Sequence, residues 1–348
     1  MIISSFRKKC VTRHLIFGFL YLIFSHPLLA LNHNSIMLNK INRLNHITLG
    51  SCNNQIFPQH HWKTMQKLLP DLFIFGGDNI YGDYKYTFKK LEKDYWFQNS
   101  RPSYNEFKKH VPIIGIWDDH DYGMNNGGAD FSGKVQSQKD FFDFMLVEAD
   151  SPRRNQEGIY TSYLFGPVGE QVKVILLDGR YFRTAKTILG EKQWAWLEEE
   201  IKNSKATFHL IVNGTAIFYP NYKKGEEWVD VPGEKEKLVQ LLEKYKPSGT
   251  LLISGDKHSS AFIKASIGGK VWHEFMTSGL THSLIGKRPK SDELSRRSKE
   301  KVNFDIYVGR SFGEILFNWD KKPSMTINIR GVKYGKVKKT RTLFASEM

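Results

Sequence analysis

Residues 111–121 read VPIIGIWDDHD, and this stretch decides the fold. Its apolar part, residues 111–117, predicts a buried β-strand, because a short continuous apolar run bounded by turn residues is typical of a strand covered on both faces. Three carboxylates and one histidine follow within residues 118–121. Such groups repel one another unless a cation or strong pairing compensates. The stretch therefore predicts a strand that ends in a metal site, with a polar helix-capping turn as the alternative.

The same arrangement recurs at other predicted strands. Apolar runs at residues 47–49, 72–75, 208–212 and 251–254 each end in a turn that carries polar or metal-ligating residue types. In open α/β sheets, binding sites form beyond the carboxyl ends of strands. One acid at such a position is usually a helix cap or a turn residue, but a set at successive strand ends predicts one shared site. Its candidate members are Cys52, Asp78, Asp119, His120, Asn213, Asp256 and His258.

Helical patterns alternate with these strands. Helices are predicted at residues 61–69, 134–147, 191–203 and 234–245. Further strands are expected at residues 172–177, 261–265, 271–277, 312–317 and 325–329, so the chain finishes rich in β-structure. Alternation of this kind indicates an α/β sandwich with mixed sheets.

The first thirty residues predict a secretory signal peptide. Four basic residues precede an apolar run over residues 15–24, and residues 1–30 contain no acid. This run is short for a bilayer-spanning helix, which needs about 20 residues. We therefore expect export to the periplasm, the cell envelope or the medium. An uncleaved N-terminal anchor is the alternative, because Leu28 stands where a small residue is preferred at the cleavage site.

Composition narrows the class of protein. The formal net charge of +15 favours phosphate-bearing partners. Two cysteines exclude a disulfide framework or a multi-cysteine zinc cluster. Cleavage near Ala30 would remove Cys10 and leave Cys52 alone, so it would form no internal disulfide. A buried apolar thiol is the simpler interpretation of Cys52, and a metal ligand is the alternative.

Two basic segments lie outside this pattern. Residues 285–301 are charged and rich in serine, which predicts an exposed loop, and residues 333–348 predict a basic C-terminal tail. A solvated tail is the simpler interpretation. Docking on an anionic membrane or cell-envelope surface is the alternative. The sequence shows no recognised nucleic-acid reader motif, so no specific nucleic-acid partner is predicted.

Two further side chains stand beside the predicted site. Tyr81, three residues after Asp78, can turn back as a phenolate ligand, because a hard trivalent ion stabilises that anion. A packed ring with its hydroxyl bonded to the backbone is the alternative. Arg180 follows Asp178 at another strand end. An arginine fork matches phosphate oxygens, and a structural salt bridge with Asp178 or a neighbour is the equal alternative.

Six motifs in this order closely resemble the PhoD-like alkaline phosphatase and phosphodiesterase family, within the metallophosphoesterases. The resemblance covers most of the chain after the signal segment, and six ordered motifs are far more specific than any one of them. The motifs are residues 50–52 (GSC), 77–81 (GDNIY), 117–126 (WDDHDYGMNN), 177–183 (LDGRYFR), 189–197 (LGEKQWAWL) and 254–258 (SGDKH).

The resemblance implies a calcineurin-like fold with four αββα layers and two mixed sheets. That domain would span residues 47–332, after a lead-in over residues 31–46. The implied cofactors are ferric iron (Fe3+) and calcium (Ca2+), with other divalent metals as alternatives. The implied partner is a phosphate-ester substrate.

The family's ligands can be carried over residue by residue. Cys52 is similar to the thiolate ligand, Asp78 to the bridging carboxylate and Tyr81 to the phenolate ligand. Asn125 resembles the asparagine after the Trp-Asp-Asp-His motif, with Asn126 as the alternative register. The late metal-binding pair corresponds to Asp256 and His258.

The metals suggest the mechanism. A metal-bound hydroxide is the expected nucleophile, attacking phosphorus in line, because coordination lowers the pKa of water towards neutrality. Arg180 would help to neutralise the phosphoryl oxygens, and Asp119 lies in the matching catalytic motif. His120 or His258 would assist proton transfer to the leaving oxygen.

The same motifs leave other functions open. A phospholipase-D-like or nuclease-like phosphodiesterase would carry the same ligands. A non-catalytic, basic surface-binding protein on the same fold is the alternative from another class. Loss of several ligands would have favoured it, and all are present in the sequence.

Overall fold

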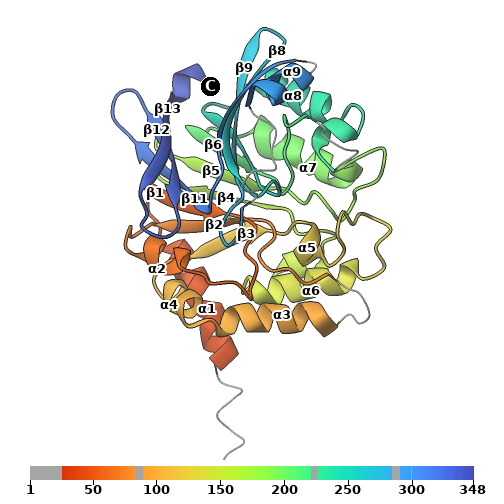
Figure 1. Ribbon diagram of the computed structural model, residues 1–348, viewed down its shortest axis with the longest axis vertical. Coiled ribbons are helices and arrows are strands. Elements are labelled where there is room, and N and C mark those ends of the chain that lie inside the picture. The colour runs from red at the N-terminus through yellow and green to blue at the C-terminus, as the bar shows by residue number, and fades with distance from the viewer. Residues whose placement is uncertain (1–25, 84–88, 221–225, 284–290, 299) are drawn as a thin grey trace, which may run out of the picture.

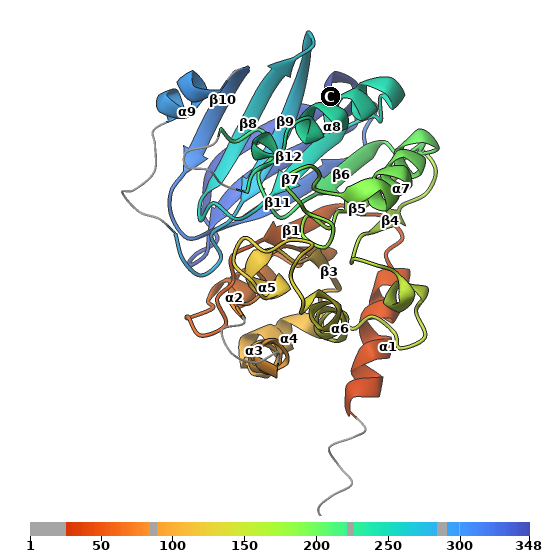
Figure 2. The ribbon, with the colours of Figure 1, turned by 90° about the vertical axis from the view of Figure 1, so that its right-hand side faces the viewer.

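The computed structural model describes residues 26–83, 89–220, 226–283, 291–298 and 300–348. Two β-sheets face each other, with helices α2–α6 on the outer side of one sheet and α7 and α8 on the outer side of the other (Figures 1 and 2). Both sheets contain parallel and antiparallel pairs. The predicted four-layer αββα sandwich with two mixed sheets is therefore confirmed.

The six-stranded sheet supplies half of the framework. Its order is β13-β12-β11-β1-β2-β3, and β1, β2 and β3 run parallel. The C-terminal strands extend it in antiparallel fashion. The strands are β1 His46–Gly50, β2 Leu72–Gly76, β3 Ile113–Ile116, β11 Ser311–Asn318, β12 Ser324–Gly331 and β13 Val337–Phe344.

The seven-stranded sheet has the order β10-β8-β9-β7-β6-β5-β4. Its centre, β5, β6, β7 and β9, is parallel, and both edges are antiparallel. The strands are β4 Thr161–Phe165, β5 Val172–Leu176, β6 Phe208–Val212, β7 Thr250–Ser254, β8 Ser260–Ile267, β9 Lys270–Thr277 and β10 Lys301–Tyr307.

The helices pack outside the sheets, and short 3-10 turns at Pro152–Asn155, Trp228–Asp230 and Ala345–Glu347 complete the elements. They are α1 His26–Asn39, α2 His61–Gln66, α3 Lys89–Ser100, α4 Pro102–Lys108, α5 Asp119–Tyr122, α6 Lys134–Phe144, α7 Gly190–Lys202, α8 Glu234–Tyr245 and α9 Ser291–Arg297.

Side chains alternate between the two faces of each strand, so the hydrophobic core consists of two clusters. On β6, Leu210 and Val212 face the other sheet, and Ile211 between them packs in a second cluster under α7 and α8. Strands buried on both faces therefore read as continuous apolar runs, which is why the sequence revealed them.

Several segments differ from the sequence-based expectations. Helices α3 and α4 and strand β4 were not predicted, and the polar composition of the two helices gives only weak local signals. Residues 337–344, expected within a solvated tail, form strand β13 and pair along β12. The predicted loop over 285–301 contains α9 and the start of β10, and residues 284–290 and 299 lie outside the described part. Cross-strand pairing and burial of Leu294 outweigh local charge here.

The signal-peptide prediction falls mostly on residues 1–25, which lie outside the described part of the chain. Helix α1 runs without a break past the expected cleavage point near Ala30. The Asn34 side chain exchanges two hydrogen bonds with the backbone of Ile113, at 2.8 and 3.0 Å, on edge strand β3. This contact blocks an open sheet edge. Within the described residues, no helix has the length and apolar character needed to cross a bilayer.

A buried carboxylate ties three strands of the six-stranded sheet together. Glu314 on β11 accepts hydrogen bonds from His46 at 3.0 Å and from Asn328 and Arg330 at 2.7 Å each. Burial alone would raise the pKa of Glu314, but these partners lower it to about 2.

The difference between the ordinary pKa of Glu314 and its pKa in the folded protein predicts that the protein loses stability in acid. The folded-state pKa of Glu314 lies below the ordinary value of 4.5, so its contribution is full above pH 4.5 and disappears as the pH falls to about 2. Because part of this contribution is screened by solvent, we expect Glu314→Gln to remove about 1–2 kcal/mol at pH 7 and almost nothing at pH 2. Urea unfolding across this pH range measures the difference, and an equal loss at both pH values would contradict the account.

Candidate metal centre

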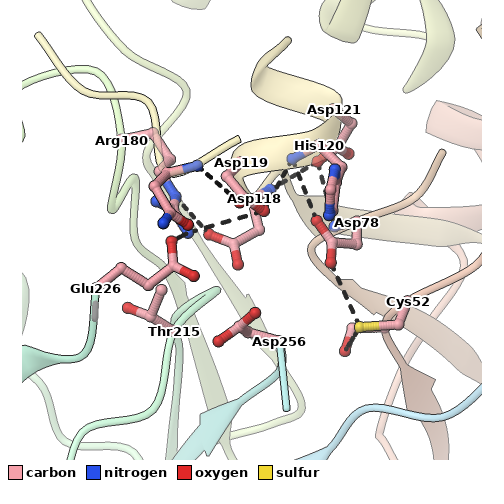
Figure 3. Close-up of polar contacts among 12 residues, drawn as sticks. Cys52, Asp78, Asp118, Asp119, His120, Asp121, Arg180, Thr215, Glu226 and Asp256 are labelled. Atoms are coloured by element: carbon pink, nitrogen blue, oxygen red, sulfur yellow. Dashed lines mark hydrogen bonds and ion pairs between the residues drawn. The ribbon is translucent and has the colours of Figure 1, made fainter. Parts of the chain in front are cut away.

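The carboxyl ends of the central strands of both sheets meet at one place. An isolated bridge between Ser51 and Ser278 joins the segment after β1 to the segment after β9. Figure 3 shows Cys52, Asp78, Asp119 and Asp256 directed toward this junction from separate strand ends. The structure thus brings together side chains that the sequence places far apart, as the strand-end pattern predicts.

The backbone at this junction is unusual. Four candidate ligands have positive φ, at 59° for Cys52, 49° for Asp78, 67° for Asp256 and 49° for His258. Non-glycine residues rarely adopt this left-handed conformation, which costs of order 1–3 kcal/mol each and clusters at functional sites. The conformation turns each side chain from its strand end toward the common centre.

Glycines allow the segments to approach closely. A Cβ atom at Gly77, where φ is +96°, would lie 2.7 Å from Cβ of Asp118, and a Cβ at Gly214 would lie 2.5 Å from a carboxylate oxygen of Asp118. Neither distance is sterically allowed. These two glycines therefore leave the space that Asp118 occupies beside Asp78.

One group of ligand types contains sulfur, nitrogen and oxygen. Ligand atoms of Cys52, Asp78 and His258 lie within 4.8 Å of one another. The Tyr81 hydroxyl lies 3.0 Å from Nε2 of His258 and 3.4 Å from a carboxylate oxygen of Asp78. Burial raises the pKa of the Cys52 thiol to about 11, so the thiolate would form only with a cation beside it. Thiolate, imidazole and phenolate together suit iron or zinc.

A second group consists of oxygens and shares Asp78 with the first. Carboxylate oxygens of Asp78, Asp118 and Asp256 lie within 4.8 Å of one another, and Asp78, Asp119 and His120 form an overlapping set. Oxygen-rich sets suit calcium, magnesium or manganese. Asp78 therefore lies between two chemically different sets of ligands.

Burial makes this cluster costly without cations. Desolvation, followed by the nearby Cys52 and carboxylate charges, raises the pKa of Asp78 well above its usual range. Burial raises the pKa of Asp118 and Asp121 to about 8 and that of Glu226 to about 7. The arrangement is one in which cation binding and loss of protons from the carboxylates are coupled.

Asp121 holds the turn that carries the cluster. Its carboxylate accepts backbone N–H bonds from Asp78 at 3.2 Å, Asn79 at 3.1 Å and Asp118 at 2.7 Å. Two strand ends are thereby fixed by one side chain. Asp121 is a positioning residue, and as the N3 residue of helix α5 it forms a capping box with the N-cap residue Asp118.

Arg180 is placed differently from the predicted substrate contact. It is fully buried, and its guanidinium pairs with Asp118 at 2.6 Å and with Glu226 at 2.5 Å. Burial opposes ionisation of Asp119, but Arg180 and His120 outweigh it and lower the Asp119 pKa. The structural salt bridge is thus present, and the phosphate contact of Arg180 stays a prediction. Asp178 is not a salt-bridge partner of the Arg180 guanidinium. Its carboxylate accepts a hydrogen bond from the Arg180 backbone N–H instead.

The asparagine segment decides between two registers. Asn125 is exposed. Asn126 has a φ of 56°, donates its backbone N–H to Asp119 at 2.9 Å, and, with its NH2 group turned toward Glu226, donates to both oxygens of that carboxylate at 3.0 Å. Asn126 therefore lies against the cluster and is the better placed of the two.

His120 lies at the margin of the centre. Its Nδ1 is 2.8 Å from a carboxylate oxygen of Asp83, and its ring lies 4.2 Å from that of Tyr81. Burial alone would lower the pKa of His120, but Asp83 and Asp119 raise it to about 9. His120 is therefore arranged to hold a proton at neutral pH.

The sequence placed Asp118 in the predicted metal-site segment without an individual role, and it did not predict a role for Asp83, Glu226 or His282. His282 lies 3.0 Å from the Tyr81 hydroxyl. It follows the carboxyl end of β9, so the strand-end rule applied to residues 278–282 would have found it. Among the described residues, no strand ends directly before Glu226, which therefore gives no comparable signal.

Comparisons with known proteins agree with this geometry. The sequence matches the family described as PhoD-like phosphatase over residues 47–323. No curated protein sequence matches the chain. A solved structure described as PhoD has a TM-score of 0.69 at 15% identity, over 86% of this chain and 68% of that one.

Two other solved structures share the fold. Purple acid phosphatase PPD1 from yellow lupin (Lupinus luteus) seeds has a TM-score of 0.60 at 11% identity, covering 86% of this chain and 54% of that one. GAP50, the anchor in the inner membrane complex of Plasmodium, has a TM-score of 0.55 at 13% identity, covering 87% and 89%. Fold and site together define a metallophosphoesterase. The chain belongs to the PhoD-like phosphatase family and is a phosphoric ester hydrolase.

The buried ion pairs predict a large stability effect. Replacing Arg180 with Met leaves Asp118 and Glu226 buried without their cation, which should cost about 3–5 kcal/mol. Arg43→Met, which breaks an exposed pair with Glu170, should cost no more than about 1 kcal/mol. Chemical unfolding of the metal-free proteins compares the two. Similar losses would contradict the assignment of Arg180 to the support of the carboxylates.

The shared carboxylate predicts a change in metal content. Asp78→Asn should weaken metal binding by about 100-fold or more and abolish turnover, because it removes one charge from both ligand sets. Asp305→Asn, which alters a surface carboxylate paired with Lys339 and Arg341, should change neither. Plasma mass spectrometry after dialysis gives the metal content, and circular dichroism monitors the fold. Metal content like that of the unsubstituted protein in Asp78→Asn would refute the shared role.

Proposed function

We propose that this chain is an exported, metal-dependent phosphoesterase that hydrolyses phosphomonoesters, phosphodiesters or both. One observation carries the proposal most directly: Asp78 lies between a thiol–imidazole group and an oxygen-rich group of ligand types. Two cations on either side of one carboxylate suit the in-line displacement of a phosphate ester. Membership of the PhoD-like phosphatase family supports the same chemistry.

The donor sets support a particular distribution of metals. The set of Cys52, Tyr81 and His258 would hold ferric iron, and Asp78 would be shared. The set around Asp256 would hold calcium or another divalent cation, because all its ligands are hard oxygens. Asn126, rather than Asn125, is the asparagine that would support this second set.

The bound metals would supply an activated water and neutralise the phosphoryl oxygens. The protein supplies orientation and protons. Asp119, hydrogen-bonded by the Asn126 backbone, stays charged beside the second set. His120, held by Asp83, is the better placed donor of a proton to the leaving oxygen. His258, close to Tyr81, is assigned to metal binding instead.

Export is proposed from the sequence of residues 1–30, where a basic segment precedes a short apolar run without acids. Cys52 is the free cysteine among the described residues, and it is fully buried. A single buried thiol is compatible with export to an oxidising compartment, because oxidants in the solvent do not reach it. Metal coordination at Cys52 would protect it further from oxidation.

A non-catalytic binding role is the second candidate. The Plasmodium anchor protein shows that a protein on this fold has an anchoring role. The exposed basic side chains of β13 would give this chain an anionic membrane or cell-envelope surface as partner. The enzyme is favoured, because ligand atoms of Cys52, Asp78 and His258 lie within 4.8 Å of one another, as do those of Asp78, Asp118 and Asp256.

Parallel hydrolysis of bis-p-nitrophenyl phosphate and p-nitrophenyl phosphate tests the proposal. We expect turnover by the iron- and calcium-loaded protein that a chelator abolishes, because removing the cations leaves the ester's charge uncompensated. The ratio of the two rates separates a diesterase from a monoesterase. The catalytic proposal would be contradicted by no turnover of either substrate in folded, metal-loaded protein, and the binding role would then lead.

A further inference from the structure

His282 comes from a segment that sequence analysis left without a function. It follows β9, and its ring is half-buried. Its Nε2 lies 3.0 Å from the Tyr81 hydroxyl and 3.1 Å from Nε2 of His258, and the last two atoms are 3.0 Å apart. Three potential ligand atoms from three separate segments therefore form a nearly equilateral triangle.

The hydrogen bonds of Thr281 fix the ring of His282. The Thr281 hydroxyl donates to the backbone oxygen of Cys52 at 3.0 Å and accepts the Asn54 backbone N–H at 2.8 Å. Nδ1 of His282 lies 3.0 Å from the same hydroxyl oxygen. Because the Thr281 proton is already used, Nδ1 must donate. The neutral ring then carries its lone pair on Nε2, which is the atom directed at Tyr81 and His258.

This is the arrangement of a metal-binding histidine, in which one ring nitrogen donates to an oxygen and the other faces the ion. The link to Cys52 is direct, since Thr281 bonds the Cys52 backbone through both its hydroxyl and its N–H, at 3.0 and 3.3 Å. The edge of the Phe57 ring packs against His282, with the ring centroids 5.9 Å apart. The ring is thus held on two sides.

We propose that His282 is an additional nitrogen ligand of the metal ion bound by Cys52, Asp78, Tyr81 and His258. This inference rests on the proposed metal-dependent function and adds a second imidazole to its sulfur-containing site. The competing interpretation is that His282 only accepts a hydrogen bond from the Tyr81 hydroxyl. That role would orient the phenol and leave the ligand set of the ion unchanged.

Cobalt(II) binding to the full chain distinguishes the two interpretations without reference to turnover. Competition with a chelator gives the affinity, and the visible absorption of the bound ion reports its ligand set. We expect His282→Ala to lower the affinity by about 100-fold and to shift the absorption bands. Thr281→Val, which removes the hydroxyl that orients the ring, should lower it by about 10-fold. His110→Ala, an exposed site paired with Glu106, is the matched control and should change nothing.

The outcomes separate the inference from the function on which it rests. If the unsubstituted protein binds cobalt and His282→Ala binds it with the same affinity and spectrum, the inference about His282 is overturned, and the metal-dependent function is not. Failure of the unsubstituted protein to bind cobalt, zinc or iron would overturn the metal-dependent function as well. Circular dichroism of each variant confirms the fold, and the graded loss from Thr281→Val remains informative if His282→Ala is unstable.

Discussion

The burial of several carboxylates side by side is the constraint on which the rest of the structure depends. Asp78 is buried just after β2, Asp118, Asp119 and Asp121 are buried just after β3, and Glu226 is buried beside them at Arg180. Their mutual repulsion and desolvation would favour an open or protonated state. One arginine, two glycines without side chains, and the proposed cations make the arrangement tenable. Metal binding and folding of this region are therefore linked.

The two sheets explain how such a cluster forms. The carboxyl ends of parallel strands lie at the same edge of a sheet, so the residues that follow them are neighbours. Because the two sheets face each other, two such edges meet. The left-handed conformation of Cys52, Asp78, Asp256 and His258 then directs each ligand inward. Burial of the apolar strands behind the site offsets the cost of this strained region.

The sequence predicted the central strands because residues such as Ile114 and Leu210 are buried in continuous apolar runs. It predicted Cys52, Asp78 and Asp256 as neighbours because each follows a strand. The sequence did not decide whether Arg180 contacts phosphate or forms a structural salt bridge. Only the three-dimensional structure shows that Asp118 and Glu226 pair with it. Strand β13 was missed because most of its residues are exposed and three of its eight residues are basic, and because its pairing with β12 depends on contacts distant in the sequence.

Anomalous X-ray diffraction from crystals grown with iron and manganese tests the central claim most directly. Data collected at the absorption edges of the two metals locate each ion independently of any activity. The account predicts two peaks on opposite sides of Asp78, with iron beside Cys52 and His258 and manganese beside Asp256. Peaks absent from this cluster, or a single ion bound without Asp78, would contradict it.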